Sequence, residues 1–353
     1  MKRGLTSKAL IAATTVALAA QLAACSSSST TKTASSGSGS AAAGATYCAG
    51  KKTIGYVDIF NSSPIEAVMS NVTKQIADKF GWGFQLVDGA GDLTKMETGI
   101  QTLVAQKVSL IIVASSDAAP LRQGLQAAKT AGIPVIEIGG GTTQSDLFTA
   151  QYAEDESQLG STVAQYIVDH VNGAKIADLQ TSLNYSGTAR EAGFRKVIDA
   201  SAGKAQIVSA QQVDTSNTVS STTKVVTDML TAHPDINVVF AVFDSMAASA
   251  AAALRQKGSS AQLFTTFTSP SNLDLMKKGQ LTGVVDANLA LTPMVAIDQF
   301  LAHGNKSGDY DADAIAKAGG LQYRLVTSPD QTFDAEATLA PFLTKWQSSY
   351  KCG

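Results

Sequence analysis

The sequence predicts an α/β protein of two similar lobes, each a doubly wound parallel sheet with helices on both faces. Strand-like and helix-like segments alternate along most of the chain, which is the pattern of such sheets. The 353 residues give room for about two domains of ordinary size. With 44% hydrophobic and 16% charged residues, the chain has enough apolar side chains for buried cores, and the composition argues against wholesale disorder.

The first lobe begins with a short apolar strand and a helix whose start is well marked. Apolar residues recur at helical spacing from Pro64 to Phe80. Ser63 is suited to the N-cap, Pro64 to the first helical position, and Glu66 completes a Ser-x-x-Glu capping box. The expected order in this lobe is strand 53–57, helix 64–80, strand 84–88, helix 94–106, strand 110–114, helix 118–131 and strand 134–138.

A second series of strands and helices follows and predicts the second lobe. Its Ala-rich run at 247–253 reflects helix propensity and tight packing. Ligands of open parallel sheets bind beyond the carboxyl ends of the strands, so two facing lobes would surround one cleft with their loops. The expected elements are helices 157–171, 188–200, 219–231 and 246–256, and strands 176–179, 206–210, 238–242, 263–267 and 282–285.

The N-terminus has the pattern of an export signal. Lys2, Arg3 and Lys8 precede an apolar run that ends in Leu22-Ala23-Ala24-Cys25, too short and Ala-rich to favour a membrane-spanning helix. The ending resembles a bacterial lipobox, which predicts a lipoprotein signal peptide over 1–24 and a lipidated Cys25. Acyl chains would then hold the protein at the membrane, on the cell surface or in the periplasm. The alternative is an ordinary secreted protein whose cleavage site lies beside a cysteine.

The segment after the signal predicts a flexible linker. Residues 25–50 are dominated by Ser, Thr, Ala and Gly, a composition that cannot offset the entropy of ordering the chain. Cys48 and Cys352 bracket the folded part. In an oxidising compartment they could form one disulfide that closes a very long loop, which we favour, or remain two unpaired thiols.

Several kinds of chemistry are excluded by what the sequence lacks. A net charge of -2 argues against nucleic-acid binding, and 3 His and 3 Cys far apart in the chain exclude a Cys-rich zinc module. The chain has no phosphate-binding loop, dinucleotide fingerprint or nucleophile elbow. The sequence therefore predicts a protein without catalytic residues, metal or cofactor.

Polar residues gather instead at the expected strand ends. Each alone could be a helix cap or a loop hydrogen bond, but their shared placement indicates a binding cleft. Charge-assisted hydrogen bonds to hydroxyls are worth roughly 1.5–3 kcal/mol each, which suits a small polyhydroxylated ligand. The residues are Asp58, Asn61, Asn184, Arg190, Asn217, Asp244, Thr268, Asp286 and Asn288.

Residues 51–327 resemble a type I periplasmic binding protein of the ribose and galactose group, the ligand-capturing component of an ABC importer. The most telling stretches are 88–105, 190–194, 230–235 and 239–247. The resemblance implies a three-crossover hinge near 153–157, 286–289 and 320–323, with a helix at 292–301 returning to the first lobe. It divides the chain into lobe 1, at 51–155 plus 289–322, and lobe 2, at 156–288 plus 323–353. The second part of lobe 2 carries a C-terminal extension with a helix over 335–347.

The resemblance also implies roles for single residues. Arg190 matches the family's ligand-binding arginine, Asn217 matches a residue that covers the ligand, and Phe243-Asp244 matches the family's Asn-Asp pair. Thr268 replaces an Asp, and residues 286–288, which end in Asn288, span the position of a hinge-side amide. In the first lobe the aromatics that start the first helix are missing unless Phe60 substitutes, and Gly139-Gly140 replaces an Asp-Arg pair. The candidate ligand-binding set is Asp58, Phe60, Asn61, Gly139, Arg190, Asn217, Phe243, Asp244, Thr268 and Asn288.

The resulting hypothesis is a monomeric, lipid-anchored solute-binding protein that closes on a sugar or polyol and passes it to an ABC permease. One alternative is a sensor that presents its closed form to a membrane receptor. Another is a binder of a non-sugar ligand such as a nucleoside. An enzyme is disfavoured by the missing catalytic constellation, and a cytoplasmic repressor by the export signal and by the lack of a helix-turn-helix before the first strand.

Overall fold

The computed structural model describes residues 48, 50–140, 143–182, 185–306 and 308–352. The expected signal peptide, the proposed lipidation site Cys25, most of the linker and Asn184 lie outside the described residues.

The first lobe is built on a five-stranded sheet in the order β2-β1-β3-β4-β5, with every neighbouring pair parallel. All residues of the central strand β3 are buried, as in parallel sheets covered on both faces. The three-residue strand β5 was not predicted. The strands are β1 (Thr53–Asp58), β2 (Gly83–Asp88), β3 (Leu110–Ala114), β4 (Val135–Ile138) and β5 (Ala150–Tyr152).

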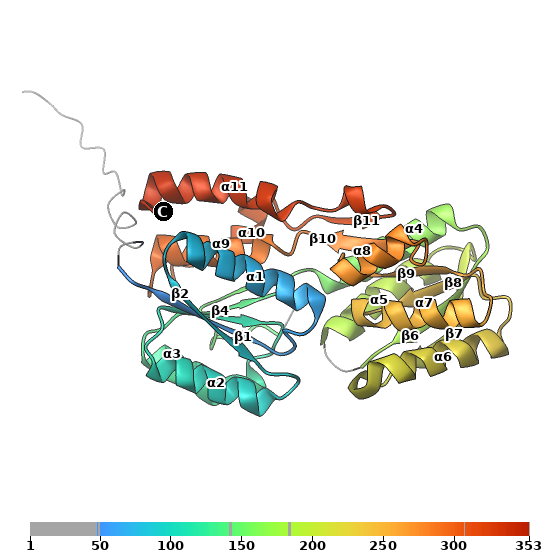
Figure 1. The fold of residues 1–353 in the computed structure, drawn as a ribbon, viewed down its shortest axis with the longest axis horizontal. Helices are drawn as coiled ribbons and strands as arrows, with labels where there is room; N and C mark the ends of the chain where they lie inside the picture. The colour runs from blue at the N-terminus through green and yellow to red at the C-terminus, as the bar shows by residue number, and fades with distance from the viewer. Residues whose placement is uncertain (1–47, 49, 141–142, 183–184, 307, 353) are drawn as a thin grey trace, which may run out of the picture. The chain divides into compact units, whose positions relative to one another are not determined.

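Helices cover both faces of this sheet (Figure 1). One layer contains α2 (Leu93–Ala105) and α3 (Arg122–Thr130), which follows the short 3-10 helix at Ala119–Leu121. The other contains α1 (Pro64–Lys79) and α9 (Leu291–His303), the helix that the resemblance returns to this lobe. The short α10 (Ala314–Lys317) contacts α9.

The second lobe has a six-stranded sheet in the order β11-β10-β9-β8-β6-β7. Its neighbouring strands are parallel except β10 and β11, which are antiparallel. The edge strand β11 was not predicted as a strand. The strands are β6 (Ala174–Gln180), β7 (Ala205–Gln212), β8 (Val238–Ala241), β9 (Gln262–Thr266), β10 (Gly283–Ala287) and β11 (Tyr323–Val326).

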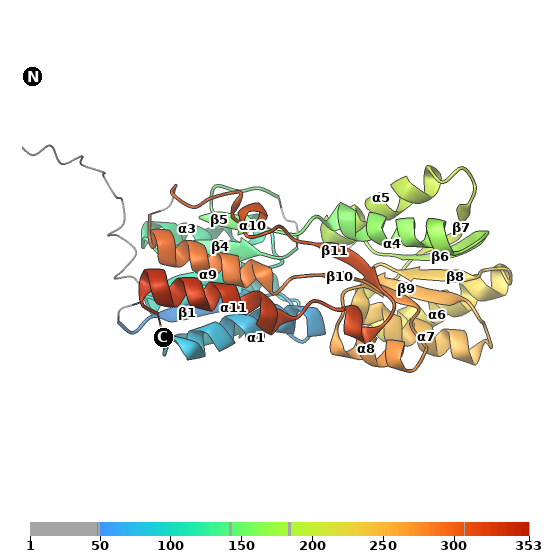
Figure 2. The ribbon, with the colours of Figure 1, turned by 90° about the horizontal axis from the view of Figure 1, so that it is seen from above.

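The helices of the second lobe form two layers (Figure 2). In the first layer α4 packs on α5, and in the second α6 packs on α7, which also contacts α8. Of these five, α8 was not predicted. The helices are α4 (Glu156–His170), α5 (Tyr185–Asp199), α6 (Thr218–Ala232), α7 (Ala247–Gln256) and α8 (Pro270–Lys277).

Two glycines allow α4 and α5 to pack closely. A Cβ at Gly160 would lie 1.8 Å from the carbonyl oxygen of Arg190, and a Cβ at Gly193 would lie 2.0 Å from that of Ser157. These distances are far below van der Waals contact, so larger residues cannot occupy either position without moving a helix. The close packing fixes where α5 presents Arg190.

The C-terminal segment corrects one part of the predicted domain division. Residues 323–353 were assigned to the second lobe, but only β11 pairs with that sheet. After a short 3-10 helix at Pro329–Gln331, α11 (Ala335–Lys345) lies along α9 (Figure 2). Trp346 Nε1 donates to Asp298 Oδ1 of α9 at 2.9 Å, and Lys345 Nζ pairs with Asp298 Oδ2 at 2.7 Å. The chain therefore passes between the lobes a fourth time, beyond the three predicted crossovers.

A disulfide joins Cys48, just before β1, to Cys352, with their Cα atoms 5.3 Å apart. It ties the end of the C-terminal segment to the start of the first lobe.

Taken together, the two wound sheets and their connections form the two-lobed α/β fold that the sequence predicted. Within the part of the chain that the structure describes, no helix combines the length and apolar character needed to cross a membrane.

Candidate functional site

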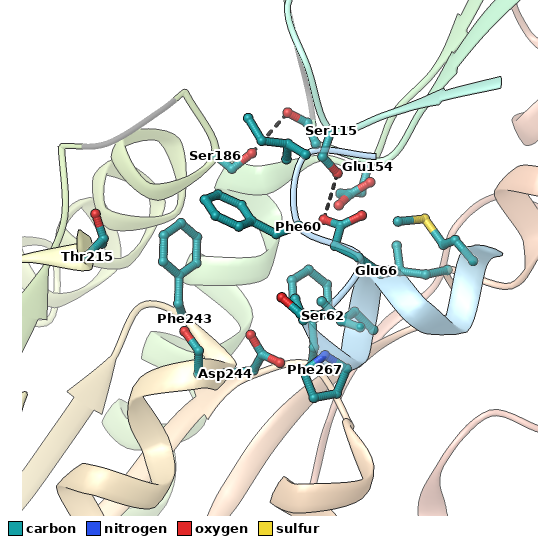
Figure 3. Close-up of a pocket in the computed structure, with 18 of the residues that line it drawn as sticks. Phe60, Ser62, Glu66, Ser115, Glu154, Ser186, Thr215, Phe243, Asp244 and Phe267 are labelled. Carbon is teal, nitrogen blue, oxygen red and sulfur yellow. Dashed lines mark hydrogen bonds between the residues drawn. The ribbon is translucent and has the colours of Figure 1, made fainter. Parts of the chain in front are cut away.

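A cavity of about 360 Å³ is lined by residues of both lobes, beside the carboxyl ends of β3 and β8. Its volume lies in the range of small-molecule sites, and Figure 3 gives a close view of its lining. The first lobe and the crossovers contribute Ile59, Phe60, Ser62, Ser63, Pro64, Ile65, Glu66, Met69, Ser115, Gly140, Glu154 and Leu289. The second lobe contributes Ser186, Arg190, Thr215, Thr218, Phe243, Asp244, Ser245 and Phe267.

Arg190 is held in one orientation by a buried ion pair. Its Nε and Nη2 donate to the two carboxylate oxygens of Glu156, at 2.5 and 3.1 Å. The guanidinium carbon lies 5.1 Å from the ring centre of Phe243 and 4.5 Å from that of Phe267, within the range of cation–π contacts. Because Arg190 is only 4% exposed and is paired in this way, its guanidinium group is held in position before any ligand binds.

Asp244 follows β8 and lines the same cavity. Its side chain is 7% exposed, and its Oδ2 has no hydrogen-bond partner. Burial raises the pKa of Asp244 to about 6, an effect that the charge of Arg190 partly opposes. The carboxylate therefore offers a free acceptor oxygen to a bound molecule.

Glu66 corrects the predicted capping box at the start of α1. Ser63 is the N-cap, but its side chain makes no capping hydrogen bond. The Glu66 Oε1 instead accepts a hydrogen bond from Ser115 Oγ at 2.8 Å, and its Oε2 is buried without a partner. Burial raises the pKa of Glu66 well above its usual range, and the charge of Asp58 raises it further. The first turn of α1 thus directs a carboxylate into the cavity (Figure 3).

Glu154 adds a third carboxylate at the first crossover, between β5 and α4. Its side chain is 6% exposed, and its Oε2 has no partner. Burial and the nearby charge of Glu156 raise the pKa of Glu154 to about 7, against the opposing charge of Arg190.

Two phenylalanines from different lobes flank the cavity. Phe60 comes from the loop after β1 and Phe243 from the loop after β8, and both line the cavity (Figure 3). Phe60 is 39% exposed. Phe267 lies beneath Arg190 with φ of 62°, a left-handed conformation that a bulky residue adopts at a cost in strain.

One hydrogen bond joins the two lobes directly across the cavity wall. Ser186 Oγ, in the first turn of α5, donates to the carbonyl oxygen of Gly140 at 3.0 Å. Both residues line the cavity. A second cavity of about 600 Å³ also touches Phe60 and Ser115, but it is lined by first-lobe residues alone.

The candidate ligand-binding residues divide into two groups. Phe60, Arg190, Phe243 and Asp244 line the cavity. Of the other first-lobe candidates, Asp58 accepts from the amide of Phe60, Asn61 accepts from Ser70, and Gly139 precedes the lining residue Gly140.

The remaining candidates of the second lobe make contacts outside the lining. Asn217 is the N-cap of α6, between the lining residues Thr215 and Thr218. Thr268 Oγ1 donates to Asp286 at 2.6 Å. Asn288 Nδ2 donates to Thr338 at 3.2 Å and thus contacts the C-terminal segment.

The lining residues that sequence reasoning did not assign to ligand binding include Glu66, Ser115, Glu154, Ser186 and Phe267. For Ser115 a signal was present, since it directly follows the predicted strand 110–114, whereas Phe267 was placed inside the predicted strand 263–267. The signal for Glu154 was hidden because β5 has only three residues. Among the described residues, no three His, Cys, Asp or Glu side chains are arranged to hold a metal ion.

The family follows from a comparison of the whole sequence. The profile of the periplasmic binding protein domain matches residues 54–306, more than half of the chain. The chain belongs to this family. Since its members are binding proteins, the chain is a binding protein and not an enzyme.

Curated relatives include two ribose import binding proteins. The Bacillus subtilis protein is 30% identical over 209 residues, a match that covers 58% of this chain and 66% of the relative, just under two thirds. The Escherichia coli protein is 27% identical over 262 residues, covering 73% of this chain and 84% of the relative.

Solved structures share the fold. A galactofuranose-binding protein has a TM-score of 0.66 and 21% identity, with coverage of 83% of this chain and 99% of that one. The Caulobacter myo-inositol-binding protein, solved with myo-inositol, has a TM-score of 0.68 and 20% identity, with coverage of 80% and 95%.

Proposed function

We propose that the chain is an extracytoplasmic solute-binding protein that captures a small polyhydroxylated molecule, a sugar or polyol, and delivers it to an ABC permease. The two relatives described above are named ribose import binding proteins. The two solved structures are named as binding proteins for galactofuranose and myo-inositol. These compounds share a small ring with several hydroxyl groups, which is the class we assign to this protein.

The observation that carries the proposal is the lining of the cavity between the lobes. Aromatic faces of Phe60 and Phe243 offer an apolar surface to a sugar ring, while Arg190 and Asp244 offer charged hydrogen-bonding groups for hydroxyls. Each lobe contributes one side of the cavity, so hinge closure would bring the two sides onto the ligand. The Ser186 to Gly140 hydrogen bond fits a closed state of this kind.

A ligand panel tests the proposal. Thermal unfolding of the purified protein is followed with pentoses, hexoses, inositols, nucleosides and amino acids at equal concentrations. A ligand bound only by the folded state raises the melting temperature, so at least one sugar or polyol is expected to do so. A rise with nucleosides or amino acids, and with no sugar or polyol, would contradict the assigned ligand class.

We propose further that Cys25 carries the lipid that holds the protein at the membrane. Cys25→Ser is expected to move the protein from the membrane fraction into the soluble extracytoplasmic fraction, because the acyl anchor is lost. The neighbouring change Ser26→Ala serves as the matched control and is expected to leave the protein at the membrane. Unchanged membrane retention of Cys25→Ser would refute the anchor.

A further inference from the structure

The second cavity, in the first lobe, lies directly beside the cavity between the lobes. Its volume is about 600 Å³, compared with about 360 Å³ for the cavity between the lobes. Ile59, Phe60 and Ser115 line both cavities, so the two spaces share part of one wall. Each volume alone lies in the range of small-molecule sites. A ligand confined to the cavity between the lobes would leave the second cavity unused.

Phe60 gives the shared wall an aromatic surface that is held in place. Phe60 is 39% exposed, but its amide donates to Asp58 Oδ1 at 2.8 Å. The next amide, of Asn61, donates to Asp88 Oδ1 at 3.2 Å. A Cβ at Gly91 would lie 2.8 Å from Cε1 of Phe60, so the backbone of Gly91 packs against the ring. The exposed ring is therefore a fixed apolar surface beside both cavities.

The rest of the second cavity combines apolar and polar side chains. Leu93, which is 37% exposed, and Pro120 contribute apolar surface. Asp117, Arg122 and Gln144 contribute polar groups. Apolar walls with a few polar groups are typical of small-molecule sites. A sugar ring, which has hydroxyl groups and apolar C–H faces, fits a lining of this kind.

The polar wall of the second cavity is held by hydrogen bonds within the first lobe. Asp117 Oδ1 accepts from the amide of Thr143 at 2.9 Å. The amide of Ser145 donates to Gln151 Oε1 at 2.7 Å, and Gln151 Nε2 donates to the carbonyl oxygen of Thr143 at 3.2 Å. These bonds fix Asp117 relative to Thr143 and Ser145 before a ligand binds.

Arg122 offers hydrogen-bond donors to this cavity from the first residue of α3. Its guanidinium forms no hydrogen bond or ion pair with another residue in the described part of the chain, whereas that of Arg190 is bonded to Glu156. A guanidinium carries five N–H donors, and a carboxylate accepts hydrogen bonds. Because Arg122 and Asp117 have opposite charges, together they suit a neutral group with several hydroxyls.

We propose that the ligand is a glycoside of two linked sugar rings, as in a disaccharide, with one ring between the lobes and the second ring in the neighbouring cavity. This inference rests on the proposed function and narrows its ligand class. Phe60 would contact both rings, because it lines both cavities. Hydroxyls of the second ring would bond to Arg122 and Asp117.

Calorimetry on the full chain with matched ligand pairs tests the proposal. Each pair is a disaccharide and the methyl glycoside of its non-reducing sugar, which keeps the linking oxygen and lacks the second ring. The pairs are cellobiose with methyl β-glucoside, maltose with methyl α-glucoside, lactose with methyl β-galactoside, and melibiose with methyl α-galactoside. In the pair that binds best, we expect the disaccharide to bind at least about tenfold more tightly, because one charge-assisted hydrogen bond supplies such a factor.

The outcomes of this comparison separate the inference from the proposed function. Equal or tighter binding of the methyl glycoside in the best pair overturns the inference and leaves the proposed function standing. The result is the same if single-ring sugars or polyols bind and no disaccharide does. If no sugar or polyol binds, here or in the wider panel, both fail.

A variant that fills the second cavity tests where the second ring lies. Leu93 lines this cavity and not the one between the lobes. We expect Leu93→Trp to weaken disaccharide binding by at least about tenfold and methyl glycoside binding by less than about threefold, because only the second ring meets the added bulk. Leu86→Trp is the matched control, since Leu86 on β2 is 43% exposed and lines neither cavity. An equal effect of Leu93→Trp on both ligands, no effect on either, or the same loss in Leu86→Trp overturns the inference.

A second pair of variants tests the hydrogen bonds to the second ring. We expect Arg122→Ala to weaken disaccharide binding by at least about fivefold and methyl glycoside binding by less than about twofold. Lys129→Ala is the control on the same helix, because Lys129 pairs with Asp146 and lines neither of these two cavities. It is expected to bind both ligands like the unchanged protein. Thermal unfolding confirms that each variant folds. Equal losses for both ligands in Arg122→Ala would overturn the placement of the second ring.

Discussion

Replacement of Arg190 by alanine tests the buried ion pair and the binding site together. The change leaves Glu156, which is 2% exposed, without its bidentate partner. Breaking a buried pair by removing one partner costs about 3–5 kcal/mol. For a protein of this size class, each kcal/mol lowers the melting temperature by about 2–4 °C, so a decrease of about 6–20 °C is expected.

An exposed pair of the same lobe gives the matched control. Lys224 and Asp228 are 77% and 49% exposed at the side chain and form an i,i+4 pair on α6. Exposed pairs of this kind contribute about 0.3–0.5 kcal/mol, so Lys224→Ala is expected to change the melting temperature by about 2 °C or less. Similar shifts for Arg190→Ala and Lys224→Ala would refute the assignment of a buried pair.

A double variant separates stability from binding. In Arg190→Met with Glu156→Leu, both charges are replaced by apolar side chains, an exchange that is often neutral or stabilising in buried sites. We expect the double variant to recover most of the lost melting temperature, while calorimetry still detects at least about a tenfold loss of ligand affinity. Full recovery of ligand affinity in the double variant would remove Arg190 from the binding site.

Three further predictions follow from packing, covalent and acid–base features. Gly160→Ala is expected to destabilise the protein and weaken ligand binding, since a Cβ there would lie 1.8 Å from the Arg190 carbonyl; unchanged thermal unfolding would contradict this. Replacement of Cys48 and Cys352 by serine is expected to reduce the free energy of unfolding by about 2–5 kcal/mol in denaturant titrations, because it removes the link across 304 residues. The raised pKa values of Glu154 and Asp244, about 7 and about 6, mean that the folded state holds protons that the unfolded state releases. The melting temperature of the ligand-free protein should therefore fall as pH rises from about 5 to about 8, and a flat or rising profile would contradict the burial of these acids.

Hydrophobic periodicity was sufficient to predict the layered α/β architecture, because buried parallel strands and amphipathic helices have distinct spacings. It failed at several short elements, whereas the longer edge strands β2 and β7 were predicted. The strand β5 has three residues, and β11 adds to the sheet at its edge in the antiparallel sense. Without β5, the acidic residues that follow it could not be placed at a strand end, and Glu154 was missed.

The candidate site was predicted in part for a related reason. Polar residues at the ends of parallel strands serve either a cavity or the caps and loops beside it, and spacing alone does not separate the two uses. Asp244 lines the cavity, whereas Thr268 bonds to Asp286 of β10 and Asn288 bonds to Thr338 of α11. Glu66 illustrates competition at one position, since its local pattern fits a capping box but Ser115, 49 residues later, holds its side chain instead.

The return of α11 to α9 and the bond between Cys48 and Cys352 place both ends of the described chain on one lobe, with their Cα atoms 5.3 Å apart. The second lobe is therefore inserted into the first. The chain enters and leaves it only through segments that connect it to the first lobe. Such a topology lends itself to circular permutation: a short peptide could replace the disulfide, and new termini could open the loop between α6 and β8. A reporter inserted at those termini would report on the movement of the second lobe without disturbing the first.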